Sequence, residues 1–494
     1  MAVPLLRKID FGNEAGDDVD PKELAKFFVE QGGFKKLTHA KERISLILAK
    51  KGVGKSALIN WLGEHLKYFD SDAVVLKLRG SDLTRDNFRL TTVPTSPNER
   101  IKDWQVRLCS SVNRELAKRI KWAAADDTIT LVESAEIAGF RSRNFVSAFA
   151  DRFTRFLDKL GPEKQSIRNE VEILKRVTNR RVWILIDDLD ATFQKKPDEI
   201  VELSTFFSAC RYLCQDIADL NIRTTMRTDV WPILRRSDEA LDKMDQYTAE
   251  ISWSDYDFRT MLARRIQWQI EAKGLPVAQP KFSLSDTQKD EYWINQVFAE
   301  TVQWGDRDQK THKVIYTISY TRPRWGIQLA KLAQRAAENS QTAVIGKEQI
   351  DEVWGDYGRK RIHDLIVEHR HQCAQVEELL NSFRGSPKRM TRDQLFDWIK
   401  KHITNLMTPV IEGVATKEPL PIASFLYRTG FIMARKDEAD GKGYDHFLFH
   451  EMPDFLSGQA NRDQGVSWEI HPCYREALDI QSASKTIRRK KGYF

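Results

Sequence analysis

The stretch Ile44–Leu62 most constrains what this chain can fold into. Its first residues, ISLILA, are apolar and β-like, its centre, KKGVGKS, is basic and rich in glycine, and apolar residues then return at helical spacing. A strand that leads into a helix needs only a short connection, so two glycines, three lysines and a serine indicate a further requirement. Backbone N–H groups and a helix N-terminus can together surround an anion. The stretch therefore predicts a bound phosphate group.

The octapeptide AKKGVGKS, Ala49–Ser56, matches a Walker A loop in which alanine replaces the usual first glycine. Gly52 and Gly54 remove side chains that would obstruct the approach of the backbone to phosphate oxygens. Lys55 is expected to reach the terminal phosphates of ATP as a catalytic residue, and the Ser56 hydroxyl is expected to bind Mg²⁺. The alternative is an ordinary basic turn between a strand and a helix. The expected nucleotide-binding residues here are Ala49, Lys50, Lys51, Gly52, Val53, Gly54, Lys55, Ser56 and Ala57.

The segment RVWILIDDLDATF, Arg181–Phe193, supplies the acidic strand end that such a loop needs. Trp183–Ile186 predicts a buried strand, and Asp187 follows at its carboxyl edge, where it is expected to hold magnesium. In P-loop ATPases, which this pair of motifs resembles, the next acid commonly orients or deprotonates the attacking water, and Asp188 has that place. Asp190 is interpreted as a helix cap or an arginine partner. The alternative is a surface strand end with three solvated aspartates.

Short apolar runs alternate with longer helical patterns between Ile44 and Ile251. The runs ISLILA, AVVLKL, VWILID and IRTTM are typical of strands in a parallel sheet that helices cover on both faces. A long charged helical stretch, Asn98–Val177, separates the second run from the third. The sequence therefore predicts an α/β fold, a P-loop parallel sheet, with mainly helical segments after Ser254.

A chain of 494 residues is too long for one core and is expected to form several domains. The sequence contains no internal repeat and no low-complexity tract, so a serial arrangement is favoured. The expected parts are an N-terminal capping segment (1–40), a P-loop ATPase core (41–252) with a helical insertion at about 98–177, a helical lid (253–345), linker helices (346–386), a winged-helix-like domain (387–480) and a basic tail (481–494).

The composition, with 41% hydrophobic and 30% charged residues, fits an ordinary globular protein. No apolar run approaches the length of a membrane span, and the first residues are too weakly apolar for a secretory signal, so a cytoplasmic location without membrane contact is expected. The five cysteines are odd in number and scattered, which argues against a disulfide framework. The net charge of +7 permits nucleic-acid binding without requiring it.

The segment Asn221–Arg236, NIRTTMRTDVWPILRR, resembles the region after Walker B in AAA+ and STAND ATPases. In those proteins the corresponding strand ends in a polar or arginine sensor of the terminal phosphate. The resemblance implies that Arg227 is the sensor, with Thr228 as the alternate. It also implies that Arg235 or Arg236 is a finger that reaches into a neighbouring subunit. The other reading of Arg227 is an arginine neutralised by local carboxylates.

The segment Ile318–Ala333, ISYTRPRWGIQLAKLA, is similar to the lid of the same ATPases. There a proline or arginine at the start of a lid helix touches the nucleotide. Pro323 suits a first helical turn, and Arg324 beside it is expected to meet the phosphates when the lid closes. Arg322 is the competing choice, and a helix start with incidental basic residues is the alternative.

Beyond Pro387 the pattern of two helices and two alternating strands looks like a winged helix. In such a module the second helix could enter a DNA groove while Arg435, Lys436 and Lys442 of the wing meet phosphate, although the second helix, LPIASFLYRTG, is mostly apolar. The closing segment WEIHPCYREALDI and the early FGNEAGDD resemble a little-characterised bacterial family of stand-alone P-loop ATPases with a D-D-L-D Walker B. That resemblance implies a place in bacterial antiviral defence or genome maintenance.

These features predict a magnesium-dependent ATPase whose ATP and Mg²⁺ site drives a conformational or oligomeric switch. A homo-oligomer is expected, and any effector activity is expected on a separate protein. The C-terminal module has two readings: contact with DNA, or a packing or switch role of the kind that the resemblance to STAND and origin-recognition ATPases implies. Two alternatives stay open: a weakly hydrolysing nucleotide-binding scaffold, and a DNA-binding protein with a regulatory ATP site.

Overall fold

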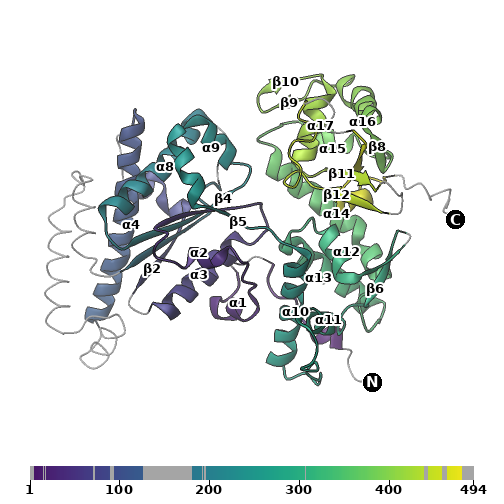
Figure 1. Ribbon diagram of the computed structural model, residues 1–494, viewed down its shortest axis with the longest axis horizontal. Helices are drawn as coiled ribbons and strands as arrows, with labels where there is room; N and C mark the ends of the chain where they lie inside the picture. Colours follow the sequence, from purple (N-terminus) through teal and green to yellow (C-terminus); the bar gives the residue numbers. More distant parts are fainter. Residues whose placement is uncertain are drawn as a thin grey trace. The chain divides into compact units, whose positions relative to one another are not determined.

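The computed structural model describes residues 5–14, 16, 18–70, 73–88, 94–125, 181–191, 193, 196–305, 307–438, 443–458 and 464–480. The chain forms two compact units (Figure 1): Gly12–Trp268, and Gln269–Phe494 together with Met1–Phe11. The division falls inside helix α10 (Asp255–Ala272). The finer boundaries that the sequence predicts remain predictions, and the basic tail 481–494 lies outside the described residues.

A parallel sheet organises the unit Gly12–Trp268. Its described strands follow the order β2-β3-β4-β1-β5, and every neighbouring pair runs parallel. This sheet confirms the α/β fold class that the alternating pattern predicts. The strands are β1 (Ile44–Ala49), β2 (Val74–Arg79), β3 (Val182–Asp187), β4 (Leu220–Arg227) and β5 (Thr248–Glu250).

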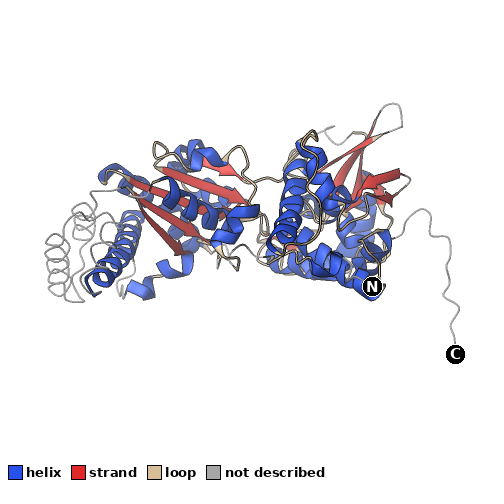
Figure 2. Cartoon of the chain, turned by 90° about the horizontal axis from the view of Figure 1, so that it is seen from below, coloured by secondary structure: helices blue, strands red, loops and turns tan. Residues whose placement is uncertain are grey.

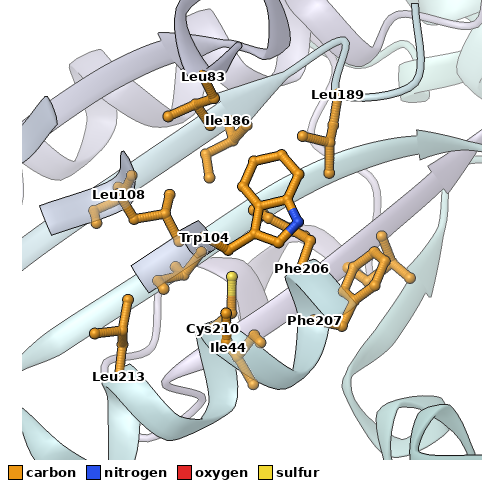
Figure 3. Packing of buried hydrophobic residues seen from close by; sticks show 14 of the residues in the cluster. Ile44, Leu83, Trp104, Leu108, Ile186, Leu189, Phe206, Phe207, Cys210 and Leu213 are labelled. Carbon is orange, nitrogen blue, oxygen red and sulfur yellow. The ribbon is translucent and has the colours of Figure 1, made fainter. Parts of the chain in front are cut away.

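Helices cover both faces of this sheet (Figure 2), as the apolar strands require. Alternate residues of β3 belong to two separate hydrophobic clusters: Ile184 and Ile186 to one, Trp183 and Leu185 to the other. Figure 3 shows part of the first cluster, where Trp104 packs among the helix residues around it. The first cluster is completed by α4 (Pro97–Ala125), α8 (Pro197–Asp216), α9 (Trp231–Ser237) and η4 (Glu239–Tyr247), and the second by α1 (Pro21–Phe27), α2 (Phe34–Leu37) and α3 (Lys55–Phe69).

The charged helical stretch expected between β2 and β3 begins as helix α4. Its Trp104 ring meets Phe206 of α8 edge-on at 5.1 Å, and its indole Nε1 donates to the Glu202 carbonyl at 2.7 Å. These contacts make the start of the stretch part of the core. The remainder, 126–177, lies outside the described residues.

Arg223 of β4 joins the N-terminal segment to the sheet. The side chain is fully buried, and it donates to the carbonyls of Leu37 at 2.8 Å and His39 at 3.0 Å, and to its neighbour Ile222 at 3.0 Å. Its guanidinium also lies 4.7 Å from the centre of the Trp183 ring. A buried cation needs such partners, so Arg223 fixes residues 37–39, at the end of α2, against the sheet.

The second unit begins with helices and contains one feature that the sequence did not predict. Between α11 (Asp286–Ile294) and α12 (Thr311–Ile318) lies an antiparallel hairpin, β6 (Thr301–Trp304) and β7 (Arg307–Lys310). The predicted helical lid is therefore interrupted by two strands. β6, TVQW, alternates polar and apolar residues over only four positions, and β7, RDQK, is polar throughout, so pattern alone does not distinguish the pair from a loop. Helices η1 (Leu5–Lys8), α13 (Pro323–Asn339), α14 (Lys347–His369) and α15 (Val376–Asn381) complete this part.

The C-terminal part contains the two helices and the hairpin that a winged-helix pattern requires, with two further strands in the sheet. The strand order is β12-β11-β13-β8, with antiparallel pairing throughout. Its elements are β8 (Arg389–Thr391), α16 (Arg392–Ile399), the π-helical η5 (Lys400–Thr404), β9 (Val410–Ile411), β10 (Val414–Ala415), α17 (Pro419–Arg428), β11 (Ile432–Asp437), β12 (Tyr444–Phe447), β13 (Val466–Ile470) and α18 (Pro472–Arg475).

Among the residues expected to meet DNA, the second helix and Arg435 make contacts within the protein, whereas Lys436 is exposed. Ile422, Phe425 and Leu426 of the second helix, α17, are buried in the protein core. Arg435 of β11 pairs with Asp437 at 2.8 Å and with Glu469 at 3.0 Å. Lys442 lies outside the described residues. The described contacts thus give α17 and Arg435 packing roles, and DNA contact by this module remains a prediction.

All five cysteines are buried and free. Among the described helices, none combines the length and the apolar character that a membrane crossing requires.

Glu469 of β13 anchors the C-terminal sheet through buried ion pairs. Its side chain is only 2% exposed and accepts from Arg435 Nη1 at 3.0 Å and Arg475 Nη2 at 2.8 Å. Burial raises the pKa of this carboxyl, but the hydrogen bond from His446 and the charges of Arg475, His446 and Lys388 outweigh burial and lower the pKa to about 2. The folded state therefore binds this proton less readily than the unfolded chain.

We expect Glu469→Gln to destabilise the protein at neutral pH, because Arg475 loses its buried partner. A depressed folded-state pKa stabilises the fold above the unfolded value of 4.5, and the stabilisation is lost as the pH falls toward 2. That contribution amounts to about 3 kcal/mol. Chemical unfolding of the two proteins should therefore differ most at pH 7 and least near pH 3.

The exposed Glu352 of α14 offers the matched control, since Glu352→Gln removes a carboxylate without a buried pair. Stability curves for Glu469→Gln and the unaltered protein that stay parallel from pH 7 to pH 3 would contradict the assignment.

Candidate functional site

The predicted site residues meet at the carboxyl edge of the parallel sheet. In the strand register Ala49 at the end of β1 lies beside Arg227 of β4, and Ile186 of β3 lies beside Thr224. The residues that follow these strands therefore share one edge of the sheet. In open α/β sheets this edge is where ligands bind.

The glycine loop between β1 and α3 has the backbone that its composition predicts. Gly52 and Gly54 both have positive φ, of 79° and 111°. A Cβ atom at Gly54 would meet nothing within 4 Å, so the conformation rather than space requires glycine there. Gly54 also caps α3 without any side-chain hydrogen bond. The first N–H groups of this helix are thus left for an anion.

Trp253, between β5 and α10, holds the loop from the side. Its indole Nε1 donates to the Val53 carbonyl at 2.7 Å. The Thr228 N–H, from the segment after β4, approaches the Ala49 carbonyl at 3.4 Å. The loop is thus fixed by residues that come from two other strand ends.

Thr225 of β4 joins the two aspartates that follow β3. Its hydroxyl donates to Asp187 Oδ1 at 2.6 Å and accepts from the Asp188 N–H at 3.3 Å. Asp188 has a left-handed backbone with φ of 53°, and its side chain is exposed. Sequence reasoning missed Thr225. The available signal was a polar pair, Thr224 and Thr225, inside a strand that is otherwise buried.

Gly80, just after β2, packs directly against the acidic turn. A Cβ atom at Gly80 would lie 2.5 Å from the Asp188 carbonyl oxygen and 2.7 Å from Leu189 Cα. Real Cβ contacts are never this short, so any side chain at Gly80 would displace the Asp188 backbone. This glycine was also missed by sequence reasoning.

Asp190 and Arg227 form a buried pair beneath the site. Asp190 Oδ2 accepts from the Arg227 N–H at 2.9 Å and lies 3.2 Å from Arg227 Nε. Burial raises the pKa of Asp190, and the hydrogen bond from Arg227 together with the charges of Arg227 and Lys55 opposes that rise. The positive charge of Lys55 therefore stabilises the negative charge of Asp190, in the turn that follows β3. Asp190 is thus the arginine partner that one reading of the sequence proposed.

Arg227 contacts a second carboxylate, with Nε 3.5 Å from Asp229 Oδ1. The described contacts of its guanidinium are therefore with local carboxylates, the alternative that the sequence left open. The sensor role of Arg227, or of Thr228, remains a prediction.

The other predicted arginines lie on α9, shortly after β4, or in the second unit. Arg235 and Arg236 are exposed in the last turn of α9, and Arg235 pairs with Asp245 at 2.7 Å. Pro323 begins α13 in the second unit, with Arg324 exposed beside it. Arg322 is buried, and its Nη1 donates to Glu368 at 2.8 Å. Arg322 is therefore held by the second unit's own core.

A segment near the N-terminus lies over the first turns of α3. The Gly16 carbonyl accepts from Asn60 Nδ2 at 2.9 Å, and a Cβ atom at Gly16 would lie 2.5 Å from Ala57 Cβ. This close approach brings the segment beside the start of the helix that follows the glycine loop. The resemblance of FGNEAGDD to a family motif gave the only sequence signal for it.

The donor set at this edge suits magnesium. Ser56 lies in the first turn of α3 and Asp187 ends β3, and both offer the oxygen ligands that Mg²⁺ prefers. The described residues contain no group of three or more His, Cys, Asp or Glu side chains placed to hold a metal. A magnesium ion bound here would therefore take most of its ligands from phosphate and water, as is usual for this ion.

Comparisons with known proteins add relatives in sequence and in fold. No protein-family model matches the chain. The 80.3 kDa protein of transposon gamma-delta from Escherichia coli (strain K12) is 20% identical over 501 residues, which cover 95% of this chain and 67% of that protein.

Two solved structures align with almost the whole chain. The Aeropyrum pernix ORC2 protein in its ADPNP-ADP complexes is 9% identical, with 92% of this chain and 91% of that chain covered and a TM-score of 0.42. The Aeropyrum pernix ORC1 protein in complex with DNA is 12% identical, with 93% and 96% covered and a TM-score of 0.36. Both TM-scores are low, and the α/β fold of this chain follows from its own strand order and loop geometry.

We expect Trp253→Phe to weaken ADP binding about fivefold, because the loss of one hydrogen bond to the loop costs about 1 kcal/mol. Isothermal titration calorimetry measures the change. Trp268→Phe, in the same unit, is the matched control and should bind ADP normally. Equal affinities of the Trp253→Phe variant and the unaltered protein would show that this bond does not support the loop.

We expect Thr225→Val to lower the rate of phosphate release from ATP by roughly tenfold, since Asp187 and Asp188 lose the hydroxyl that joins them. ADP affinity should change little, because Thr225 does not contact the glycine loop. Thr225→Ser keeps the hydroxyl and should retain most of the activity. A fully active Thr225→Val protein would remove Thr225 from the site.

Proposed function

We propose that the chain is a magnesium-dependent ATPase of the AAA+/STAND type. The observation that carries this proposal is the meeting, at one sheet edge, of a left-handed glycine loop and an acidic turn. The loop leads into an uncapped helix, and the turn holds two aspartates joined by Thr225. A positive helix end and an acidic strand end at the same edge of the sheet suit a nucleoside triphosphate that carries a divalent cation.

The glycine loop binds the phosphates in this proposal. The N–H groups from Gly52 to Ala57 donate to phosphate oxygens, and the Lys55 amine neutralises charge on the terminal phosphates. Lys55 makes no ion pair within the described part of the chain, although its positive charge favours a lower pKa of Asp190. Its amine donors are therefore free to meet the nucleotide.

Ser56 and Asp187 are the proposed magnesium ligands. The bound ion supplies charge neutralisation at the transferring phosphoryl group. The hydrogen bond from Thr225 fixes the orientation of the Asp187 carboxylate. The other oxygen of that carboxylate, Oδ2, accepts no such bond from the described residues and is the one proposed to face the ion.

Asp188 is the proposed acceptor of a hydrogen bond from the attacking water. Its carboxylate is exposed at the edge, and its backbone is held in a left-handed conformation between Thr225 and Gly80. A strained backbone that its surroundings fix on both sides is a common way to aim a catalytic side chain. This geometry supports Asp188 rather than the buried Asp190 as the residue that positions water.

We propose that nucleotide binding drives a switch between conformations or oligomeric states. Pro323 and Arg324 would contact the nucleotide from the lid. Arg235 and Arg236 are both exposed, and because Arg235 pairs with Asp245, Arg236 is the preferred candidate for a finger toward a neighbouring copy. A homo-oligomer, a separate effector protein and DNA contact through the C-terminal module complete the proposal. The similarity to a transposon protein supports a place in a bacterial defence or genome-maintenance system.

Steady-state phosphate release from ATP tests the ATPase proposal. Lys55→Ala and Asp188→Asn should each reduce the rate by about a hundredfold or more, because Lys55 neutralises charge on the terminal phosphates and Asp188 positions the attacking water. Asp188→Asn should retain ADP binding, whereas Lys55→Ala should weaken it. Chelation of magnesium should abolish the activity of the unaltered protein.

Asp216→Asn is the control for the acid substitution, because Asp216 is exposed at the end of α8, away from the carboxyl edge. Activity that survives both Lys55→Ala and Asp188→Asn would place the reaction elsewhere. Tight ADP binding without turnover in the unaltered protein would favour the nucleotide-binding scaffold instead.

A further inference from the structure

Arg79, the last residue of β2, lies beside the acids of the nucleotide site. In the strand register it is paired with Asp187 of β3, one of the two proposed magnesium ligands. Adjacent strands are about 4.8 Å apart, a distance that an arginine side chain easily reaches across. Sequence reasoning gave no role to this arginine, because only the strand order brings it next to the acidic turn.

Arg79 belongs to the face of the sheet that α3 covers. Side chains alternate along a strand, so Arg79 shares the face of Val75. By the same alternation, Asp187 shares the face of Leu185. Val75 and Leu185 both belong to the hydrophobic cluster that α3 completes, whereas Leu76 belongs to the cluster on the other face. Arg79 and Asp187 are therefore on the same side of the sheet as the helix that follows the glycine loop.

A neighbouring lysine shows where along α3 this arginine lies. Lys77, on the same face of β2, donates through Nζ to the Asn60 carbonyl at 3.4 Å and to Asn60 Oδ1 at 3.2 Å. From Lys77 to Arg79 the strand advances about 6.6 Å toward the carboxyl edge. Because α3 connects two parallel strands and runs opposite to them, the helix advances about 6 Å in the same direction from Asn60 back to Ser56. Arg79 is therefore level with Ser56, the other proposed magnesium ligand.

The backbone of Arg79 is fixed on both sides. Its N–H donates to Asp82 Oδ2 at 2.8 Å. The next residue, Gly80, packs so closely against the acidic turn that a Cβ atom there would lie 2.5 Å from the Asp188 carbonyl oxygen. The base of the arginine side chain therefore keeps its position relative to Asp187 and Asp188. A residue that contacts a reacting group needs support of this kind.

The guanidinium of Arg79 has donors that a ligand can use. The side chain is exposed, and no carboxylate of the described residues lies within ion-pair distance of it, although Asp187 is on the adjacent strand. Asp187 and Asp188 make this edge of the sheet negative, and ATP adds negative charge even when one magnesium ion is bound. A cation here offsets that charge, and the planar fork of an arginine matches the oxygens of a phosphate group.

We propose that Arg79 is a further catalytic residue of the ATP site, and that its guanidinium donates to oxygens of the terminal phosphate. This inference rests on the ATPase function proposed above. Lys55 meets the phosphates from the glycine loop after β1, whereas Arg79 comes from β2, on the other side of β3 and its metal ligand. ADP lacks the terminal phosphate, so this contact distinguishes ATP from ADP. During phosphoryl transfer the same contact stabilises charge on the transferred group.

The affinities of the full-length protein for ATPγS and for ADP, each measured with magnesium by isothermal titration calorimetry, test this proposal. Arg79→Ala should weaken ATPγS binding about tenfold, the effect of losing a hydrogen bond between charged groups. ADP binding should change little, in contrast to Lys55→Ala, which should weaken both. The rate of phosphate release from ATP should fall by roughly tenfold or more in Arg79→Ala.

Two further variants separate phosphate contact from a structural role. Arg79→Lys keeps the positive charge without the planar fork and should recover part of the ATPγS affinity. Arg181→Ala removes an exposed arginine at the opposite end of β3 and should leave both affinities unchanged. Thermal unfolding checks that each variant is folded.

The ratio of the two affinities decides the outcome. If folded Arg79→Ala protein keeps the ATPγS-to-ADP affinity ratio of the unaltered protein, the assignment of Arg79 is wrong and the ATPase proposal still stands. If the unaltered protein binds neither nucleotide, the ATPase proposal is wrong and this inference is wrong with it.

Discussion

The left-handed backbone at Gly52 and Gly54 is the constraint on which the rest of the site depends. It turns the chain between β1 and α3 so that the helix starts at Gly54 without a side-chain cap among the described residues. N–H donors without an acceptor are unfavourable at a helix start. An anion that binds there accepts their hydrogen bonds, and the helix dipole also favours its negative charge. Trp253 bonds the loop at Val53 and stabilises this arrangement in the absence of a ligand. The proposed binding of a triphosphate depends on this loop conformation.

The acidic side of the site depends on polar groups buried between strands. Thr225 bonds both Asp187 and the Asp188 N–H, and Asp190 pairs with Arg227. Buried hydrogen bonds of this kind fix side-chain directions more strictly than apolar packing does, because an unpaired polar group is costly. Each of the three aspartates thereby has a different environment, and only Asp188 is exposed. The chemistry assigned to each follows from that difference.

The sequence predicts the parts of this structure that local pattern determines. The apolar runs predict the parallel sheet, and the spacing of glycine, lysine and serine predicts the phosphate loop. Thr225 and Trp253 are not predictable in the same way, because their contacts depend on strand order. Val53 and Trp253, for example, lie 200 residues apart in the chain. Likewise, the β6–β7 hairpin has only four residues in each strand, and β7 is polar throughout, so the apolar alternation is too short to identify the strands. The roles of Arg227, Arg235, Arg236 and Arg324 came from resemblance alone and remain predictions.

A crystal structure of the protein with a non-hydrolysable ATP analogue and magnesium tests the central claim most directly. The account predicts phosphates surrounded by the backbone of Gly52–Ser56, with one metal ion between the Ser56 hydroxyl and the Asp187 carboxylate. A nucleotide bound elsewhere, with the glycine loop empty and Lys55 and Asp187 contacting no common ligand, would contradict it.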